Sequence, residues 1–490
     1  MLLDKILTDV CKECIKGNLF INISNIDYDS RNIKKDGLFI CIKGEVSNGH
    51  HFIKNAIENG AKAFIVDEEI DYIEGYTYIK VKDSKKTMAK IASNFYNNPS
   101  KDIEIIGVTG TNGKTSVTTF LSQILNYYNK CGLIGTIKID DGKNEIISKN
   151  TTPDSLDLQK SLFNMLENKC NYCAMEVSSH SLALNRVEGV DIDIGIFTNL
   201  TEDHLDFHKN FNDYRDVKET LFYKTKKANI INIDDQSGKI ILDHIKNIDT
   251  PLYTYAIENE ADFMASEIIY NSNGVSYKLI TPTYEDYITI PIPGKFTVYN
   301  TLAAISACYI LNIPIEIIKK GLEQSTGVEG RVEVVRNKKN LNIIVDYAHT
   351  PDALENILNS IKDFAPGKVI VVFGCGGDRD KQKRPMMGKI AQQNSDIVII
   401  TTDNPRTENP DNIIDDILIG MDNKNNNYII IKDRKEAIRK AISIANKDDI
   451  VLIAGKGHET YQIIGRVKYD FDDRKIAKEI ADNKIGRAHV

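Results

Sequence analysis

Short apolar runs alternate with helix-like patterns along the first hundred residues of this chain. Strand-like runs occupy 37–42, 63–66 and 78–81, and helix-like patterns occupy 51–59 and 87–96. This alternation is typical of strands joined by crossover helices. The polar sequence Asn-Asn-Pro-Ser at 97–100 ends the alternation and predicts a linker.

The same alternation returns after the linker and continues through the rest of the chain. Short β-like pieces at 275–280 and 287–292 interrupt it, and Gly327–Gly330 predicts a second hinge. Beyond this hinge, near-continuous apolar runs indicate buried parallel strands, at 341–345, 368–373, 397–401 and 450–454. We therefore expect an α/β protein with three domains, 1–100, 101–330 and 331–490, of which the last is doubly wound.

The composition excludes several classes of protein. With 490 residues, of which 42% are hydrophobic and 27% charged, the chain resembles an ordinary soluble globular protein. Its net charge of −7 argues against a nucleic-acid-binding protein. Asp4 and Lys5 interrupt the N-terminus, and no apolar stretch approaches the ~18 residues of a membrane span. We therefore expect a cytoplasmic protein with neither a signal peptide nor a membrane span.

Eight cysteines are too few and too scattered to indicate a disulfide framework. Two C-x-x-C pairs, Cys11/Cys14 and Cys170/Cys173, raise the hypothesis of a zinc site. The first pair lies on a helical stripe that begins at Leu3, and Cys173 lies in a strand-like run. We therefore expect these cysteines to pack in the core rather than to bind metal.

Residues 108–118, VTGTNGKTSVT, place a glycine-rich turn between an apolar run and a helical pattern. Such a turn wraps backbone N–H groups around a polyphosphate, with Lys114 neutralising charge and Thr115 free to bind Mg²⁺. A standard phosphate loop has glycine where this chain has Val108, and a tight turn before a capping threonine is the alternative. The pattern predicts an ATP site made by Gly110, Thr111, Asn112, Gly113, Lys114 and Thr115.

Polar motifs follow the apolar runs of the C-terminal third. They are DYAHTP at 346–351, GCGGDRD at 374–380, DNPR at 403–406 and GKGHE at 455–459. In open α/β sheets, ligands bind outside the carboxyl ends of the strands, so we expect these loops to line one crevice. Any one of them taken alone could be a simple turn.

The motifs together resemble one enzyme family. In chain order they are TGTNGKT, TTPDS (151–155), EVSSH (176–180), TNLTEDHLDFH (198–208), DYAHTPD, GCGGDRD and DNPR. This set, which spans essentially the whole chain, resembles the MurE family of cytoplasmic peptidoglycan-precursor ligases within the Mur ligases. The resemblance implies an N-terminal domain for the uridine nucleotide, a central P-loop parallel-sheet ATPase domain and a C-terminal Rossmann-like domain for the amino acid.

The reaction that this resemblance implies is ATP-driven amide synthesis through an acyl phosphate. Its substrates are small molecules: ATP, the UDP-N-acetylmuramoyl dipeptide that ends in D-glutamate, and meso-2,6-diaminopimelate. We expect a monomer. Because two anions must approach each other in the first step, the site needs cations. The implied catalytic residues are Lys114, Glu176, His204 and Lys218.

The implied cofactor is Mg²⁺, held by Thr115 and Glu176, with a second ion near His204. Lys218 aligns with the lysine that is carbamylated in this family, and a carbamate can coordinate Mg²⁺ where an ammonium would repel it. Taken alone, Lys218 between acidic neighbours favours a solvated surface lysine, and His204 could be a structural histidine.

The resemblance also implies the remaining contacts. Further ATP contacts are Asn300, Arg331, Asp346 and His349. Contacts to the UDP substrate are Ser30, the turn at 44–47, Asn150, Thr151, Thr152, Ser178, Arg186 and Lys218. Residues 29–31 could equally be a capped helix start. The chain departs from the family pattern at Leu184, where some relatives have a polar contact, and at Thr297, where the usual residue is asparagine.

DNPR is the motif that discriminates between amino-acid substrates. A guanidinium can grip a carboxylate through two parallel hydrogen bonds, and diaminopimelate differs from lysine by one carboxylate. The implied diaminopimelate contacts are Arg379, Asp403, Asn404, Pro405, Arg406, Gly455 and Glu459. The alternatives are a lysine-adding ligase of the same family, which would lack Arg406, and a catalytically silent ATP-dependent binding protein. Residues 485–490 do not continue the amphipathic pattern before them, and we assign them no function.

Overall fold

The computed structural model describes residues 1–44, 47–203, 207–271, 274–325, 327–362, 364–422 and 424–482. They form two compact units: one contains Met1–Tyr255 and Ser306–Ile313, the other Ala256–Ile305 and the chain from Pro314 on. Each unit is described by itself below. Within the described ranges, no helix combines the length and hydropathy that crossing a membrane requires.

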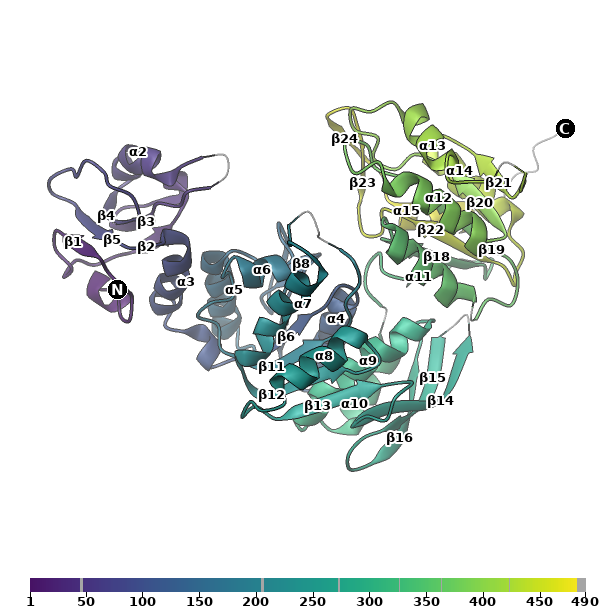
Figure 1. Cartoon of the computed structure of the whole chain (residues 1–490), viewed down its shortest axis with the longest axis horizontal. Coiled ribbons are helices and arrows are strands. Elements are labelled where there is room, and N and C mark those ends of the chain that lie inside the picture. Colours follow the sequence, from purple (N-terminus) through teal and green to yellow (C-terminus); the bar gives the residue numbers. More distant parts are fainter. Residues whose placement is uncertain are drawn as a thin grey trace. The chain divides into compact units, whose positions relative to one another are not determined.

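The N-terminal sheet belongs to the first unit and is drawn in purple in Figure 1. Its order is β1-β5-β4-β3-β2, and only β1 runs antiparallel to its neighbour. The strands are β1 (Cys14–Lys16), β2 (Asn25–Asp27), β3 (Gly37–Ile40), β4 (Ala61–Val66) and β5 (Thr77–Lys80). The helical elements are α1 (Leu3–Ile6), η1 (Ser30–Asn32), η2 (Gly49–Phe52), α2 (Ile53–Glu58), α3 (Ser84–Phe95) and η3 (Pro99–Lys101). The Asp83 side chain caps α3 by accepting a hydrogen bond from the Lys86 N–H over 2.9 Å.

The prediction for Cys11 and Cys14 is wrong. Helix α1 ends at Ile6, and Asp9 takes a left-handed φ of 57°, which stops any helix from continuing. Both cysteines are exposed, and Cys14 lies in β1. Cys170 and Cys173 are buried, as predicted. Among the described residues, no group of three or more His, Cys, Asp and Glu side chains is placed to hold a metal ion.

The central sheet of the first unit places the glycine-rich turn. Its order is β13-β12-β11-β6-β10-β7-β8-β9, parallel from β13 to β7 and antiparallel in β7-β8-β9. The strands are β6 (Glu104–Thr109), β7 (Cys131–Ile134), β8 (Lys138–Asp140), β9 (Glu145–Ile147), β10 (Tyr172–Glu176), β11 (Ile192–Phe197), β12 (Thr225–Asn232) and β13 (Leu252–Ala256). The helices are α4 (Lys114–Asn126), α5 (Ser155–Glu167), α6 (Ser179–Ala183), α7 (Phe211–Glu219), η4 (Thr220–Tyr223) and α8 (Gln236–Ile245). Strands β6 and β10, almost fully buried side by side, end at the loops that carry the site.

The second unit contains an antiparallel meander and a doubly wound sheet. The meander consists of β14 (Phe263–Asn271), β15 (Gly274–Ile280) and β16 (Glu285–Ile290). The helices that follow the meander in sequence are α9 (Lys295–Ile310), whose last residues belong to the first unit, and α10 (Ile315–Glu323).

The doubly wound sheet has the order β17-β18-β22-β19-β20-β21, and only β17 is antiparallel. Its strands are β17 (Glu333–Val334), β18 (Asn342–Asp346), β19 (Val369–Phe373), β20 (Ile397–Ile400), β21 (Tyr428–Ile430) and β22 (Ile450–Ala454). A separate hairpin is made by β23 (Tyr461–Ile464) and β24 (Val467–Asp470). The helices are α11 (Pro351–Lys362), α12 (Lys383–Asn394), α13 (Pro410–Leu418), α14 (Arg434–Ile444) and α15 (Asp473–Asp482).

Two cores cover the two faces of this sheet. One contains apolar side chains of α11, α12 and α13, and the other contains those of α14 and α15. Successive residues of the four central strands, β18, β22, β19 and β20, alternate between the two cores, because side chains alternate across a strand. The predicted doubly wound architecture is confirmed.

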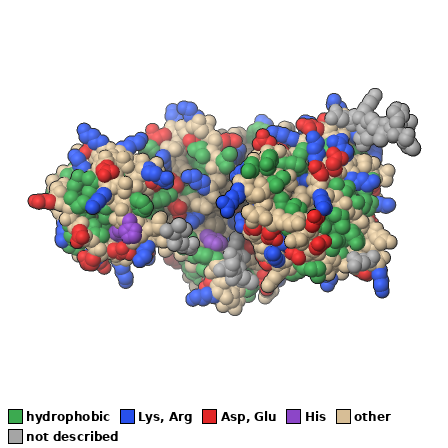
Figure 2. Space-filling model, turned by 90° about the horizontal axis from the view of Figure 1, so that it is seen from above, with side chains coloured by type: hydrophobic (Ala, Val, Ile, Leu, Met, Phe, Trp, Pro, Cys, Tyr) green, Lys and Arg blue, Asp and Glu red, His purple; other side chains and the backbone are tan. Residues whose placement is uncertain are grey.

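Acidic and basic side chains are mixed on the molecular surface. In Figure 2, Lys and Arg lie among Asp and Glu over the face that is shown, without one sign dominating the described surface there. This agrees with the small net charge of −7.

Candidate functional site

The predicted phosphate loop joins β6 to α4. Gly113, with a left-handed φ of 88°, is the N-cap of α4 and has no side chain to cap it. The first turn of α4 therefore offers backbone N–H groups to an anion. Asn199 holds the loop from one side: its carbonyl accepts from the Thr111 N–H over 2.8 Å, and its Oδ1 accepts from the Asn112 N–H over 2.9 Å.

Two lysines converge on this loop. Lys114 Nζ donates to the carbonyl oxygens of Gly110 (3.0 Å) and Thr111 (2.7 Å). Lys218 Nζ donates to the same Gly110 oxygen over 2.8 Å from the last turn of α7. A Cβ on Gly110 would collide with Thr198 Oγ1, so this close packing requires glycine.

Lys218 is not a surface residue. Its side chain is buried, with 1% of the residue exposed, and its ammonium lies 4.5 Å from the centre of the Tyr214 ring. Burial and, second, the nearby Lys114 charge lower the pKa of Lys218 well below its usual value. The surface interpretation of Lys218 is wrong, because α7 turns this position inward although its neighbours in sequence are charged.

Glu176 ends β10 and is also buried. Its two carboxylate oxygens accept from Thr136, one from the backbone N–H at 2.8 Å and one from Oγ1 at 3.1 Å. A Cβ on Gly135 would lie 2.5 Å from Glu176 Oε1, so glycine is needed there as well. Each oxygen keeps a further lone pair, and a carboxylate with a hydroxyl such as that of Thr115 is a donor set that suits Mg²⁺. The residues present therefore fit a Mg²⁺–nucleotide complex.

A cavity of about 240 Å³ brings the two lysines together with residues predicted for the UDP substrate. Its lining is Lys114, Asn150, Thr151, Ser178, Ser179, His180, Arg186, Tyr214 and Lys218. Thr152 lies behind it, buried, and donates from Oγ1 to the Glu176 carbonyl over 2.8 Å. Arg186 donates to the Thr152 carbonyl over 3.1 Å and forms an ion pair of 2.9 Å with Asp154.

Ser179, His180 and Tyr214 line this cavity although we did not predict them. Ser179 Oγ lies 2.9 Å from Nε2 of the buried His208, whose Nδ1 lies 3.5 Å from Asp213. The EVSSH and DHLDFH patterns contain three of these residues, so the signal was present without an assigned role. His204 lies outside the described residues.

Three other predictions concern local structure. The Asp29 side chain caps η1 by accepting a hydrogen bond from the Arg31 N–H, and it also forms an ion pair with the Arg31 guanidinium. Residues 29–31 are therefore a capped helix start. Ser30 is buried within it. In the 44–47 turn, Gly44 N–H donates to the Ser47 carbonyl over 2.9 Å; residues 45 and 46 lie outside the described residues. Leu184 caps the C-terminal end of α6 and is half-buried.

The other residues predicted for ATP lie in the second unit. Asn300 is buried in α9. Thr297, one turn earlier, is buried and donates to the Pro293 carbonyl over 2.9 Å. The Arg331 guanidinium lies 4.6 Å from the centre of the Tyr347 ring.

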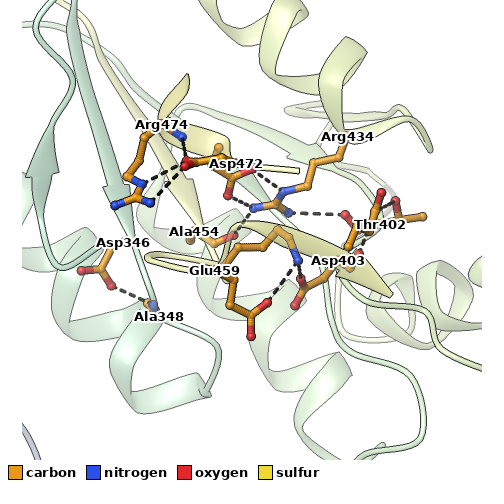
Figure 3. A network of polar contacts seen from close by, with 12 residues as sticks. Asp346, Ala348, Thr402, Asp403, Arg434, Ala454, Glu459, Asp472 and Arg474 are labelled. Carbon is orange, nitrogen blue, oxygen red and sulfur yellow. Dashed lines mark hydrogen bonds and ion pairs between the residues drawn. The ribbon is translucent and has the colours of Figure 1, made fainter. Parts of the chain in front are cut away.

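Asp346 and His349 follow β18. Asp346 accepts from the backbone N–H groups of Val332 (2.8 Å) and Ala348 (2.7 Å), which Figure 3 shows for Ala348. Burial raises the pKa of Asp346, and the nearby Arg331 opposes that rise. Burial lowers the pKa of His349. Two titrating groups at one strand end thus have pKa values shifted by desolvation, which is common at functional sites.

The loops predicted for diaminopimelate meet at the carboxyl ends of β19 and β20. Gly377 N–H donates to the Asn404 carbonyl over 2.9 Å, and Arg406 Nη1 donates to the Gly377 carbonyl over 2.8 Å. A Cβ on Gly376 would lie 3.0 Å from Arg406 Nη1 and 3.8 Å from Arg379 Cγ. The Arg406 guanidinium and the aliphatic stem of Arg379 thus lie beside the same glycine, and the Arg379 guanidinium donates to the Asp378 carbonyl over 3.1 Å.

A third loop, after β22, supplies Glu459 to the same place. Glu459 Oε2 accepts from Asn404 Nδ2 over 2.8 Å and from Lys456 Nζ over 3.2 Å. A Cβ on Gly455 would lie 3.6 Å from Asp403 Oδ2. Sequence reasoning missed Lys456, because a lysine between two glycines carries no signal of burial. Pro405 is buried in the same turn.

A buried ion pair supports the ends of β20 and β22 from beneath. Arg434 and Asp473 are both fully buried, with Nη2 and Oδ2 2.7 Å apart. The same guanidinium donates to the carbonyls of Ala454 (2.9 Å) and Thr402 (3.4 Å), as Figure 3 shows. Arg434 thus fixes the residues at which the DNPR and GKGHE loops begin.

Comparison with known proteins agrees with this arrangement. Three family models match the chain: "Mur ligase family, catalytic domain" at 22–96, "Mur ligase middle domain" at 108–308, and "Mur ligase, glutamate ligase domain" at 330–457. A protein of Clostridioides difficile (strain 630), named UDP-N-acetylmuramoyl-L-alanyl-D-glutamate–2,6-diaminopimelate ligase, is 62% identical over 466 residues, which are 95% of this chain and 96% of the relative. A protein of the same name from Alkaliphilus metalliredigens (strain QYMF) is 48% identical over 95% of each chain.

A solved structure with that same ligase name superimposes with a TM-score of 0.74 at 29% identity, over 98% of each chain. The family models together match more than half of the chain, and these relatives match nearly all of it. The chain therefore belongs to the Mur ligase family.

Proposed function

We propose that this chain is an ATP-dependent ligase that adds meso-2,6-diaminopimelate to UDP-N-acetylmuramoyl-L-alanyl-D-glutamate. The proposal rests above all on one observation: the Arg406 guanidinium lies against Gly376 and Gly377, in a loop hydrogen-bonded to Asn404, and the stem of Arg379 lies beside the same glycine. A guanidinium at this place suits a substrate with a carboxylate that lysine lacks. The names of the most similar relatives agree with this choice.

The first step joins the substrate carboxylate to the γ-phosphoryl group of ATP and releases ADP. Lys114 and the N-terminus of α4 bind the phosphates and offset their charge. Thr115 and Glu176 would hold one Mg²⁺, a second would lie near His204, and a carbamylated Lys218 would serve as a further ligand. Bound Mg²⁺ would neutralise charge between the phosphoryl oxygens and the carboxylate. The burial of Lys218, with its lowered pKa, favours the neutral amine that reacts with CO₂ to form a carbamate.

In the second step the amine of diaminopimelate attacks the acyl phosphate, an amide bond forms and phosphate leaves. Arg406 binds the carboxylate that lysine lacks, and Arg379 binds the opposite end of the substrate. Asp403, Asn404, Pro405, Gly455 and Glu459 complete this pocket. Asn300, Arg331, Asp346 and His349 contribute to the nucleotide site.

The cavity between α4, α6 and α7 receives the end of the UDP substrate that carries the reacting carboxylate. Asn150, Thr151, Ser178 and Arg186 line it, and Thr152 supports it from behind. Ser30 and the 44–47 turn bind the uridine end.

We further propose the domain boundaries 1–100, 101–330 and 331–490, a monomeric state and a cytoplasmic location.

Two alternatives are less well supported. A lysine-adding ligase would not need an arginine at position 406, because lysine lacks the carboxylate that this arginine is proposed to bind. A binding protein without activity would not need Lys114 and Lys218 together at one loop and one cavity.

Release of phosphate from ATP, measured with the UDP-dipeptide and a panel of amino acids, tests the proposal. Turnover with meso-diaminopimelate and very little with lysine is expected. Comparable turnover with lysine would favour the lysine-adding alternative, and no turnover with any amino acid would favour the silent binding protein.

A further inference from the structure

Lys456 occupies an unusual position for a lysine. It is completely buried, and its ammonium donates to Asn404 Oδ1 (2.9 Å), Glu459 Oε2 (3.2 Å) and Asp403 Oδ1 (3.3 Å). An ammonium has three N–H donors, so these contacts use all of them. A buried lysine is costly unless it is paired and hydrogen-bonded in this way.

The ammonium lies between two carboxylates. Asp403 comes from the loop after β20 and Glu459 from the loop after β22, so Lys456 joins two loops that are far apart in sequence. Figure 3 shows Asp403 and Glu459 close together beside Arg434. Without Lys456 these carboxylates would lose the cation that they share, and at close range their charges repel each other.

Each carboxylate uses only one oxygen for this contact. Among the described residues, Asp403 Oδ2 and Glu459 Oε1 have no side-chain or backbone hydrogen-bond donor. The three groups together have a net charge of −1. The unused oxygens therefore suit an ammonium group of a ligand, and they belong to the loops that carry Arg406 and Gly455.

Asn404 takes part in the same hydrogen-bond network as Lys456, Asp403 and Glu459. Its Oδ1 also accepts from the Ile463 N–H over 2.9 Å, and Gln462 Nε2 donates to the Asp403 carbonyl over 2.7 Å. The start of hairpin β23–β24 thus fixes the DNPR turn, and Lys456 fixes the acidic side chains relative to it. Such support from behind sets the orientation of groups that touch a ligand.

We infer that Lys456 is a positioning residue for the amino-acid substrate: it orients Asp403 and Glu459 so that their remaining oxygens receive the substrate ammonium. This inference rests on the proposed function for the identity of that substrate. It assigns Asn404 to the support of Glu459, in addition to any contact of its own with the substrate.

The test compares Lys456→Met, Lys456→Arg and, as a matched control, Lys468→Met. Lys468 is an exposed lysine of β24 that lies 4.1 Å from the centre of the Tyr461 ring, and Lys456 lies 5.8 Å from the same ring. The wild type is first assayed with the panel of amino acids, and KM and kcat are then measured for whichever amino acid it uses. A substrate other than diaminopimelate would thus refute the proposed function and still leave the role of Lys456 open to measurement.

Lys456→Met should raise KM for the amino acid about tenfold or more, the cost of a lost charged hydrogen-bond network, and leave KM for ATP and for the UDP-dipeptide within about twofold. Lys456→Arg keeps the charge but cannot place a planar guanidinium at the same three acceptors. Its KM for the amino acid should therefore lie between those of the wild type and Lys456→Met. Lys468→Met should behave as the wild type.

Two further measurements separate positioning from general support of the fold. In a Glu459→Gln background, Lys456→Met should add little to the rise in KM, because the two changes act on one interaction. If Lys456→Met does not fold, as judged by its thermal transition, Lys456→Arg decides alone: a raised amino-acid KM supports the inference. Folded variants with wild-type KM for the amino acid, or with all three KM values raised equally, would overturn it.

Discussion

Lys218 Nζ donates a 2.8 Å hydrogen bond to the carbonyl oxygen of Gly110, which places a buried amine of α7 directly against the phosphate loop. Lys114 donates to the same oxygen. Burial and the neighbouring Lys114 charge both disfavour a second cation at this carbonyl, so a reaction that makes the Lys218 side chain anionic replaces a disfavoured ammonium with a group that Lys114 attracts. Carbamylation of Lys218 is such a reaction.

Lys218→Ala should therefore remove most turnover and leave the fold intact, because it deletes the group that would carry the carbamate. Added short carboxylic acids should restore part of the activity by supplying a carboxylate in the space that the side chain leaves. The measurement is phosphate release with and without acetate, with Lys209→Ala, an exposed lysine before α7, as control. Normal activity in Lys218→Ala would exclude the proposed role.

Lys114→Ala should abolish acyl-phosphate formation. The γ-phosphoryl group would lose its fixed cation, a loss of roughly 3 kcal/mol or more in transition-state stabilisation. Binding of the UDP-dipeptide should weaken but persist, because Lys114 is only one of the residues that line its cavity, and Ser30 and its surroundings belong to the separate N-terminal sheet region. Calorimetric titration with the UDP-dipeptide and an assay of ADP formation check both points, and parallel loss of both would indicate misfolding instead.

Arg406→Ala should sharply lower kcat/KM for meso-diaminopimelate, because the remaining contacts to that carboxylate cannot reproduce a bidentate fork. A site built around a buried charge rejects analogues that leave it unpaired by factors on the order of 10⁴, so the wild type should almost ignore lysine. The kcat/KM for lysine should rise little in the variant. Removing Arg406 removes the cost of leaving its charge unpaired, but it does not create a pocket for the ammonium end of lysine. The test is kcat/KM for both amino acids on both proteins; efficient use of lysine by the wild type would contradict the assignment.

Glu408 should make stability depend on pH in a defined window. The buried Arg384 pairs with it and lowers the pKa of Glu408 from 4.5 to about 2. A carboxylate with a depressed pKa stabilises the fold above its unfolded pKa, and this contribution is lost as the pH falls toward the folded value. The Tm difference between wild type and Glu408→Gln should therefore be constant above pH 5 and shrink between 4.5 and about 2. A difference that stays constant through that range would show that the ion pair does not stabilise the protein.

Much of the fold was predictable because strands such as 368–373 and 450–454 are continuous apolar runs, and only burial on both faces explains such runs. The antiparallel strands β8 and β9 were not predicted, since they are short, with β8 half-buried and β9 exposed, and so carry little hydrophobic pattern. Cys11 was misplaced because periodicity does not reveal a left-handed residue such as Asp9.

The candidate site was also predictable only in part. The phosphate loop and the arginines of the C-terminal loops have motifs that were recognisable in the sequence. Lys218 and Lys456 have no such local signal: both are buried by tertiary packing among charged or glycine neighbours, where sequence alone favours exposure. Thr136, which fixes Glu176, lies 40 residues away from it and was equally invisible.

The buried pair of Arg434 and Asp473 makes the stability of the C-terminal sheet depend on the last described helix. Asp473 follows Arg434 by 39 residues, and it opens α15, the last described helix. Until that helix has been made, the guanidinium at the start of α14 lacks its bidentate carboxylate partner, and loss of one partner from a buried ion pair costs about 3–5 kcal/mol. Strands β20 and β22, whose ends Arg434 contacts, are made before that partner, so we expect this part of the sheet to gain its full stability only after α15 has emerged.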